Sequence, residues 1–62
     1  MEFNVSTLDN NEQAENLKKT ILTSEPNANV DVDLDSKKVT IKSEASAETF
    51  KQLIVAAGHK VS

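Results

Sequence analysis

The sequence of 62 residues contains no cysteine, no tryptophan, no tyrosine and no arginine. The absence of cysteine excludes a disulfide framework, thiolate catalysis, and any zinc or iron–sulfur site that is built on thiolates. The absence of arginine, together with a net charge of −3, excludes the basic stripe by which nucleic-acid-binding modules attract phosphates. We therefore expect no nucleic acid among its partners.

Long apolar runs are also missing from the chain. The longest is the five residues 53–57, whereas a membrane-spanning helix needs about 20. Residues 1–5 lack the positively charged and apolar regions of a secretory signal. We expect one domain over residues 1–62, no membrane insertion and a cytoplasmic location.

A catalytic cavity is not expected in a chain of this length. A domain of about this size buries only about 60% of the surface that its unfolded chain exposes. The few large apolar side chains are needed for the core and leave little to line a pocket of about 300 Å³. No group of acid and base residues stands out, and we predict that the protein is not an enzyme.

Apolar and polar residues alternate in two parts of the chain, which predicts strands. In residues 2–7 this alternation places Phe3 and Val5 on one face. In residues 29–42 it continues through two runs, and a turn at residues 35–38 makes them an antiparallel hairpin.

This turn sets Leu34 opposite Val39 and Val32 opposite Ile41, so that one face of the hairpin is apolar. The other face carries alternating aspartates. A calcium loop needs a glycine turn and a bidentate glutamate, and neither accompanies these aspartates. We interpret them as a solvated sheet face.

Two further segments have the period of an amphipathic helix. The first contains Leu17 and Ile21, follows an N-cap at Asn10 with Gln13 in the capping-box position, and ends before Pro26. The second follows Ser46 and ends near Gly58.

A short final strand is predicted in residues 59–62, with Val61 facing inward. The resulting order is strand, helix, strand, strand, helix, strand. It predicts an α+β, ferredoxin-like βαββαβ sandwich, with a four-stranded antiparallel sheet and two helices on one face.

Two stretches of the sequence have a pattern that is shared with a known family. Residues 32–41 have the pattern V-D-L-x-x-K-x-V-T-I, and residues 57–61 read A-G-H-K-V. In these stretches, and in their spacing along the whole chain, the sequence resembles the heavy-metal-associated domain family of small copper chaperones and P-type ATPase domains. The resemblance implies that the protein acts in metal transport. It also implies that its partner is a metal-transporting P-type ATPase domain of similar fold. We expect a monomer.

Members of that family bind Cu(I), and sometimes zinc, through a Met-x-Cys-x-x-Cys motif between the first strand and the first helix. Here the motif falls on residues 8–13, with Leu8 at the methionine position and Asn10 and Gln13 at the two cysteine positions. Thiolates select Cu(I), whereas neutral amides offer only weak oxygen ligands. We do not expect Asn10 and Gln13 to bind Cu(I), and we interpret them as the helix cap.

A second hypothesis is a site for a harder metal. The family fold implies that Asp9, Glu12 and His59 lie near one edge, where three such ligands suit a weakly bound divalent ion, zinc or copper. Acidic residues at a helix start are also stabilised by the helix dipole without a metal. His59 also has a structural interpretation, in which it packs beside Gly58 or faces water. If it lies beside the loop instead, its imidazole is expected to hydrogen-bond the Asp9 or Asn10 region.

The resemblance also implies a docking surface on the first helix and the preceding loop. Charged side chains on such a surface steer the encounter with a partner more than they stabilise the complex. The sequence thus predicts a copper-chaperone-like domain with a degenerate metal loop, which acts in metal homeostasis or docks to a metal-transport partner. The alternative is a pure protein-interaction or scaffold module without metal. The predicted docking residues are Glu12, Glu15, Lys18, Lys19 and Lys60.

Overall fold

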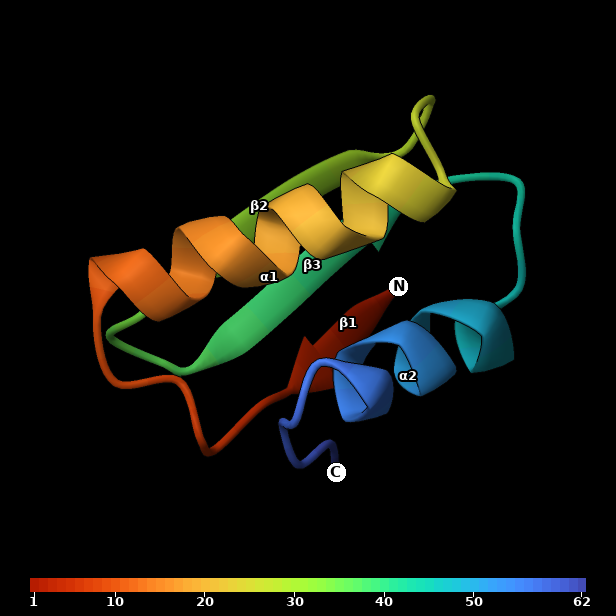
Figure 1. Ribbon diagram of the computed structural model, residues 1–62. Helices are drawn as coiled ribbons and strands as arrows, with labels where there is room; N and C mark the ends of the chain where they lie inside the picture. Colours follow the sequence, from red (N-terminus) through yellow and green to blue (C-terminus); the bar gives the residue numbers. More distant parts are fainter.

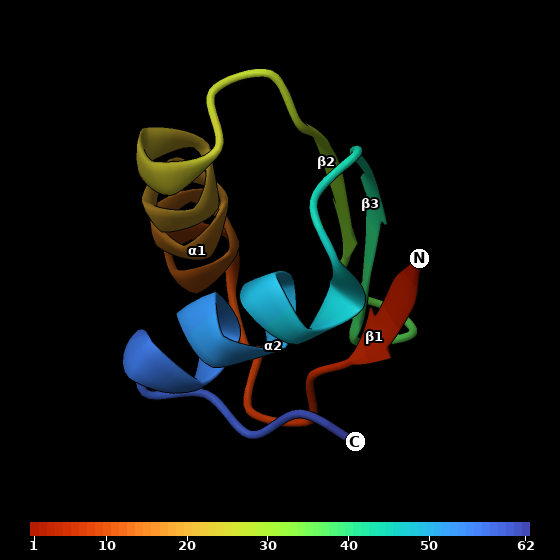
Figure 2. The ribbon, with the colours of Figure 1, turned by 90° about the vertical axis from the view of Figure 1, so that its right-hand side faces the viewer.

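The computed structural model describes all 62 residues. An antiparallel sheet with the strand order β1-β3-β2 forms one layer, and both helices cover one of its faces (Figures 1 and 2). The predicted α+β class and its ferredoxin-like arrangement are confirmed. The elements are β1 (Glu2–Asn4), α1 (Asn11–Ser24), β2 (Asn29–Asp33), β3 (Lys38–Lys42) and α2 (Ala47–Ala56).

The predicted fourth strand is not formed, since the sheet has three strands. The final segment nevertheless runs beside β1, where Asn4 and Ser62 exchange two backbone hydrogen bonds of 3.4 and 2.9 Å. Such a mutual pair is one step of an antiparallel ladder. The next possible steps are lost because the backbone N–H of Lys60 donates to the hydroxyl of Thr7 at 3.2 Å instead.

The pairing of β2 with β3 differs from the prediction by two residues. Val30 lies opposite Ile41 and Val32 lies opposite Val39, so the prediction that Val32 faces Ile41 and Leu34 faces Val39 was wrong. An even shift keeps every side chain on its expected face of the sheet. The apolar pattern is therefore satisfied equally well by either register.

The turn between these strands selects the observed register. It spans residues 34–37, since Asp33 already pairs with Lys38. The carboxylate of Asp33 accepts the backbone N–H of Asp35 at 3.0 Å, which is an Asx turn. Lys37 then adopts a left-handed conformation with φ 56° and returns the chain into β3.

Both helices have the predicted boundaries. The hydroxyl of Ser46 accepts the backbone N–H of Thr49 at 3.2 Å and caps α2. Gly58 follows this helix with φ 91°, a conformation that side-chain-bearing residues rarely adopt. Helix α1 ends at Ser24, two residues before Pro26. Neither helix is long and apolar enough to cross a membrane.

One apolar cluster fills the space between the sheet and the helices, and no polar or charged side chain is buried. Leu8 and Ala28 were not predicted for the core, because they lie in loops, where periodicity gives no signal. Val30, Val32 and Leu34 are only half-buried, since β2 is at the edge of the sheet. The buried cluster consists of Phe3, Val5, Leu8, Leu17, Ile21, Ala28, Val39, Ile41, Phe50 and Ile54.

Neighbouring residues of α2 provide a test of this core. Ile54 is 0% exposed and Val55 is 55% exposed. Ile54→Val is expected to lower the free energy of unfolding by about 0.5–1.5 kcal/mol, because it removes one buried methylene group. Val55→Ala is expected to change it by less than about 0.5 kcal/mol. Urea denaturation measures both, and equal effects would contradict this assignment of faces.

Candidate functional site

The loop between β1 and α1, residues 5–10, holds the positions of the family metal motif and is the candidate site. Leu8 fixes this loop to the core, since its side chain is 0% exposed. The backbone N–H of Leu8 also donates to the carbonyl of Val5 at 3.2 Å. The loop is therefore shaped by apolar packing at its centre.

The two residues at the cysteine positions are engaged in capping α1. The side-chain oxygen of Asn10 accepts the backbone N–H of Gln13 at 2.8 Å. The side-chain oxygen of Gln13 accepts the backbone N–H of Asp9 at 2.7 Å. The predicted capping box is confirmed, except that the returning bond reaches Asp9 rather than Asn10. Both amide oxygens therefore already accept hydrogen bonds from the protein.

Lys37 connects the β2–β3 turn to the candidate site. Its Nζ lies 3.4 Å from the carbonyl oxygen of Ser6 and 3.4 Å from a carboxylate oxygen of Asp9, and its own carbonyl accepts the N–H of Val5 at 2.8 Å. The ion pair is exposed and is worth at most about 1 kcal/mol. Sequence reasoning missed this role of Lys37, because no local pattern reports a contact between two distant loops.

His59 lies beside the same loop and is half-buried. Its Nδ1 is 2.7 Å from the hydroxyl oxygen of Thr7, and that oxygen also accepts the backbone N–H of Lys60 at 3.2 Å. His59 therefore lies beside the loop, and its partner there is Thr7 rather than the Asp9 or Asn10 region. The imidazole thus ties the end of the chain to the start of the loop.

The three predicted hard ligands do not come together as a metal site. No three His, Asp or Glu side chains of the chain are grouped so that they could hold an ion. The carboxylate of Asp9 faces Lys37, the ring of His59 faces Thr7, and Glu12 is exposed in the first turn of α1. The donors at the cysteine positions are two neutral amides, which do not fit Cu(I).

The predicted docking residues lie mainly on the outer face of α1. Glu12, Glu15 and Lys19 are exposed, as is Lys60, and Lys18 is half-buried. None of the five takes part in either ion pair of the chain. Their charges are therefore available to a partner.

Comparison with solved structures decides the family. The chain is 37% identical to the copper chaperone Atx1 from Synechocystis PCC6803, with a TM-score of 0.93 and coverage of 100% of this chain and 98% of that chain. The chain belongs to the family of Atx1-like copper chaperones.

Two other similar structures support this assignment. One, described as "Crosstalk between Cu(I) and Zn(II) homeostasis", is 39% identical with a TM-score of 0.95, over 100% of this chain and 98% of that chain. A gold binding protein is 31% identical with a TM-score of 0.94, over 98% of this chain and 94% of that chain. No protein-family model and no curated protein matches the sequence.

Membership of this family confirms two predictions made from the sequence. The resemblance to small copper chaperones is confirmed by the similarity over the whole chain. Atx1-like proteins are non-catalytic metal-trafficking proteins, so the prediction that this protein is not an enzyme is confirmed as well.

The capping role of Asn10 can be tested against its neighbour. Asn10→Ala is expected to lower the free energy of unfolding by about 0.5–2 kcal/mol, because it removes the acceptor for the Gln13 N–H. Asn11→Ala, at the exposed first residue of α1, is expected to change it by less than about 0.5 kcal/mol. If thermal or urea denaturation gives both variants the same stability, Asn10 is not the cap.

Proposed function

We propose that this chain acts in metal homeostasis as a docking protein that has the copper-chaperone scaffold but does not carry Cu(I). The observation that supports this proposal is the hydrogen bonding of Asn10 and Gln13, which cap α1 at the positions of the cysteines. Their amides lack the negative charge and the polarisable sulfur that bind Cu(I). The proposed partner is a metal-transporting P-type ATPase domain of similar fold, in the cytoplasm.

The loop beside the docking surface is held in place by the protein alone. Leu8 anchors it in the core, Lys37 contacts it from the β2–β3 turn, and His59 contacts it through Thr7. A preformed surface pays little ordering entropy when a partner binds. This favours docking by a monomer whose loop does not need a metal to order it.

A weakly bound zinc or copper(II) ion is the second hypothesis for the same end of the molecule. It is supported by the position of His59, whose imidazole is held at the loop that also carries Asp9. Binding through these residues requires the imidazole to leave Thr7 and the carboxylate to leave Lys37. We therefore expect such an ion to bind the chain with low affinity.

Restoring the thiolates tests the first part of the proposal. The wild-type chain is expected not to withdraw Cu(I) from a chromophoric chelator, whereas Asn10→Cys/Gln13→Cys is expected to withdraw it, because the scaffold places both positions as the family does. Asn10→Ser/Gln13→Ser is the control without thiols and is expected to behave as the wild type. Withdrawal of Cu(I) by the wild-type chain would contradict the proposal.

Calorimetry with Zn(II) and Cu(II) addresses the hard-metal hypothesis in the same samples. A heat of binding that disappears in His59→Ala supports a site that includes His59. A saturable heat that this variant leaves unchanged excludes His59 as a ligand.

Docking is tested by titrating the ¹⁵N-labelled chain with a P-type ATPase metal-binding domain. Chemical-shift changes are expected in residues 7–19, and Lys18→Glu/Lys19→Glu is expected to change the affinity several-fold, because it reverses two available charges. Lys51→Glu, on the exposed face of α2, is the matched control. The absence of shifts in α1 would refute this class of partner and leave the scaffold module.

A further inference from the structure

The sheet has an open edge at β2. Strand β3 lies on one side of β2, and no strand lies on the other (Figure 1). No backbone–backbone hydrogen bond outside the helices and strands involves residues 29–33. In an antiparallel edge strand, alternate residues turn their N–H and C=O groups outward. These groups of β2 are therefore free to pair with another chain.

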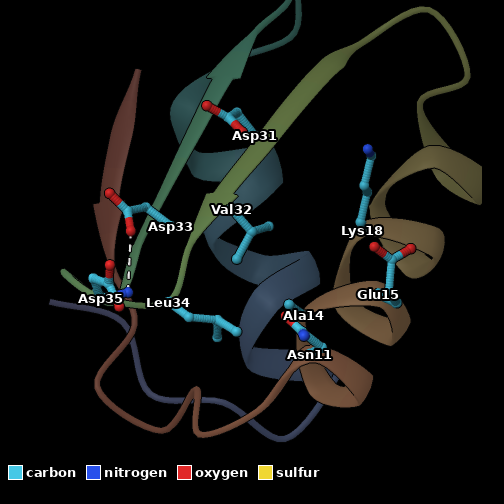
Figure 3. A pocket seen from close by; sticks show the side chains of 9 residues that line it. All are labelled: Asn11, Ala14, Glu15, Lys18, Asp31, Val32, Asp33, Leu34 and Asp35. Atoms are coloured by element: carbon cyan, nitrogen blue, oxygen red, sulfur yellow. Dashed lines mark hydrogen bonds between the residues drawn. The ribbon is translucent and has the colours of Figure 1, made fainter.

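A groove of about 560 Å³ lies between this edge and α1. Its apolar lining consists of Ala14, Val32 and Leu34. Figure 3 shows the side chains of Val32 and Leu34 directed toward α1, while those of Asp31 and Asp33 are directed to the opposite side of β2. The edge thus offers an apolar surface on one side of the strand and carboxylates on the other.

The charge along this groove is uncompensated. Asp33 lies opposite Lys38 in the sheet, but the ammonium of Lys38 pairs with Glu2 at 3.6 Å. Neither ion pair of the chain includes a charged residue of the groove. The groove residues thus include four carboxylates and a single ammonium. These charged residues are Glu15, Lys18, Asp31, Asp33 and Asp35.

We propose that this groove binds an extended, basic segment of a partner protein as an added strand along β2. The segment pairs with the outward backbone groups of β2, as in other cases of β-strand addition. Its alternate apolar side chains contact Val32 and Leu34, and the intervening lysines or arginines lie over Asp31 and Asp33. The partner is thus identified by an alternation of apolar and basic residues.

Strand β3 shows that β2 accepts a strand of this chemistry. On the edge of β2 that pairs with β3, Val32 lies opposite Val39 and Asp33 lies opposite Lys38. The sequence Lys38–Lys42 itself alternates basic or polar residues with valine and isoleucine. A segment of similar pattern meets the same residue types on the outer edge of β2.

A second copy of this chain fits the edge poorly. Antiparallel pairing of β2 with itself around Asp31 would place two aspartates directly opposite each other, and like charges at that distance are destabilising. Charged residues on an edge strand are a common means of preventing self-association. The unpaired carboxylates therefore favour a basic partner over a dimer.

The proposed site shares Glu15 and Lys18 with the α1 docking surface, but its main contacts lie on β2. It does not depend on an ATPase domain as partner. NMR chemical-shift changes in residues 29–35 report binding at the β2 groove, and changes in residues 7–13 report binding at the α1 docking surface. The failure of either proposal can therefore be seen separately.

The test uses the ¹⁵N-labelled full chain and a capped eight-residue peptide in which valine alternates with lysine and threonine. Saturable shifts are expected in residues 29–35 and in the facing turns of α1. Asp31→Asn/Asp33→Asn is expected to weaken binding by about three- to tenfold. Glu44→Gln/Glu48→Gln removes two exposed carboxylates outside the groove and is expected to leave binding unchanged.

Two altered peptides separate strand addition from nonspecific attraction. Glutamate in place of lysine is expected to abolish binding, and so is N-methylation of alternate backbone nitrogens, because it removes the donors that pair with β2. Equal binding of either altered peptide overturns the proposal. So do equal effects of the two double variants, shifts confined to other surfaces, or concentration-dependent dimerisation of the chain through β2.

Discussion

The burial of β3 is the constraint on which the other elements depend. This strand lies between β1 and β2, and its inward residues Val39 and Ile41 are 0% exposed. Both helices cover that face (Figure 2), and Phe50 of α2 belongs to the same buried cluster. A chain of this length supports one such core, and no polar side chain enters it. Binding functions are therefore confined to loops, exposed helix faces and the sheet edge.

The side chains at the family metal position serve as structural connections in this chain. Asn10 and Gln13 use their side chains to cap α1, while Lys37 and Thr7 connect the loop to two other segments. These contacts are individually weak, and together they define the shape of the surface next to α1. The proposed docking role needs such a defined surface and does not need a thiolate.

Local features of the sequence predicted most of the fold, whereas contacts between distant segments were harder to predict from it. Asn10 and Ser46 cap their helices as expected, because capping involves residues three positions apart. The β2–β3 register was missed because an even shift leaves Val32 on the same face. The fourth strand was overpredicted because Lys60 bonds to the hydroxyl of Thr7. At the candidate site, the family resemblance located the loop, but only the structure showed which side chains meet there.

The two cysteine positions of the loop lie outside the core, although Leu8 of the same loop is part of it. Asn10 is exposed and Gln13 is half-buried, and neither belongs to the buried cluster. Exchange of cysteine for amide at these positions alters the chemistry of the loop without changing the volume of the core. Substitutions at these two positions can therefore change which ligands the loop offers while the apolar core keeps its packing.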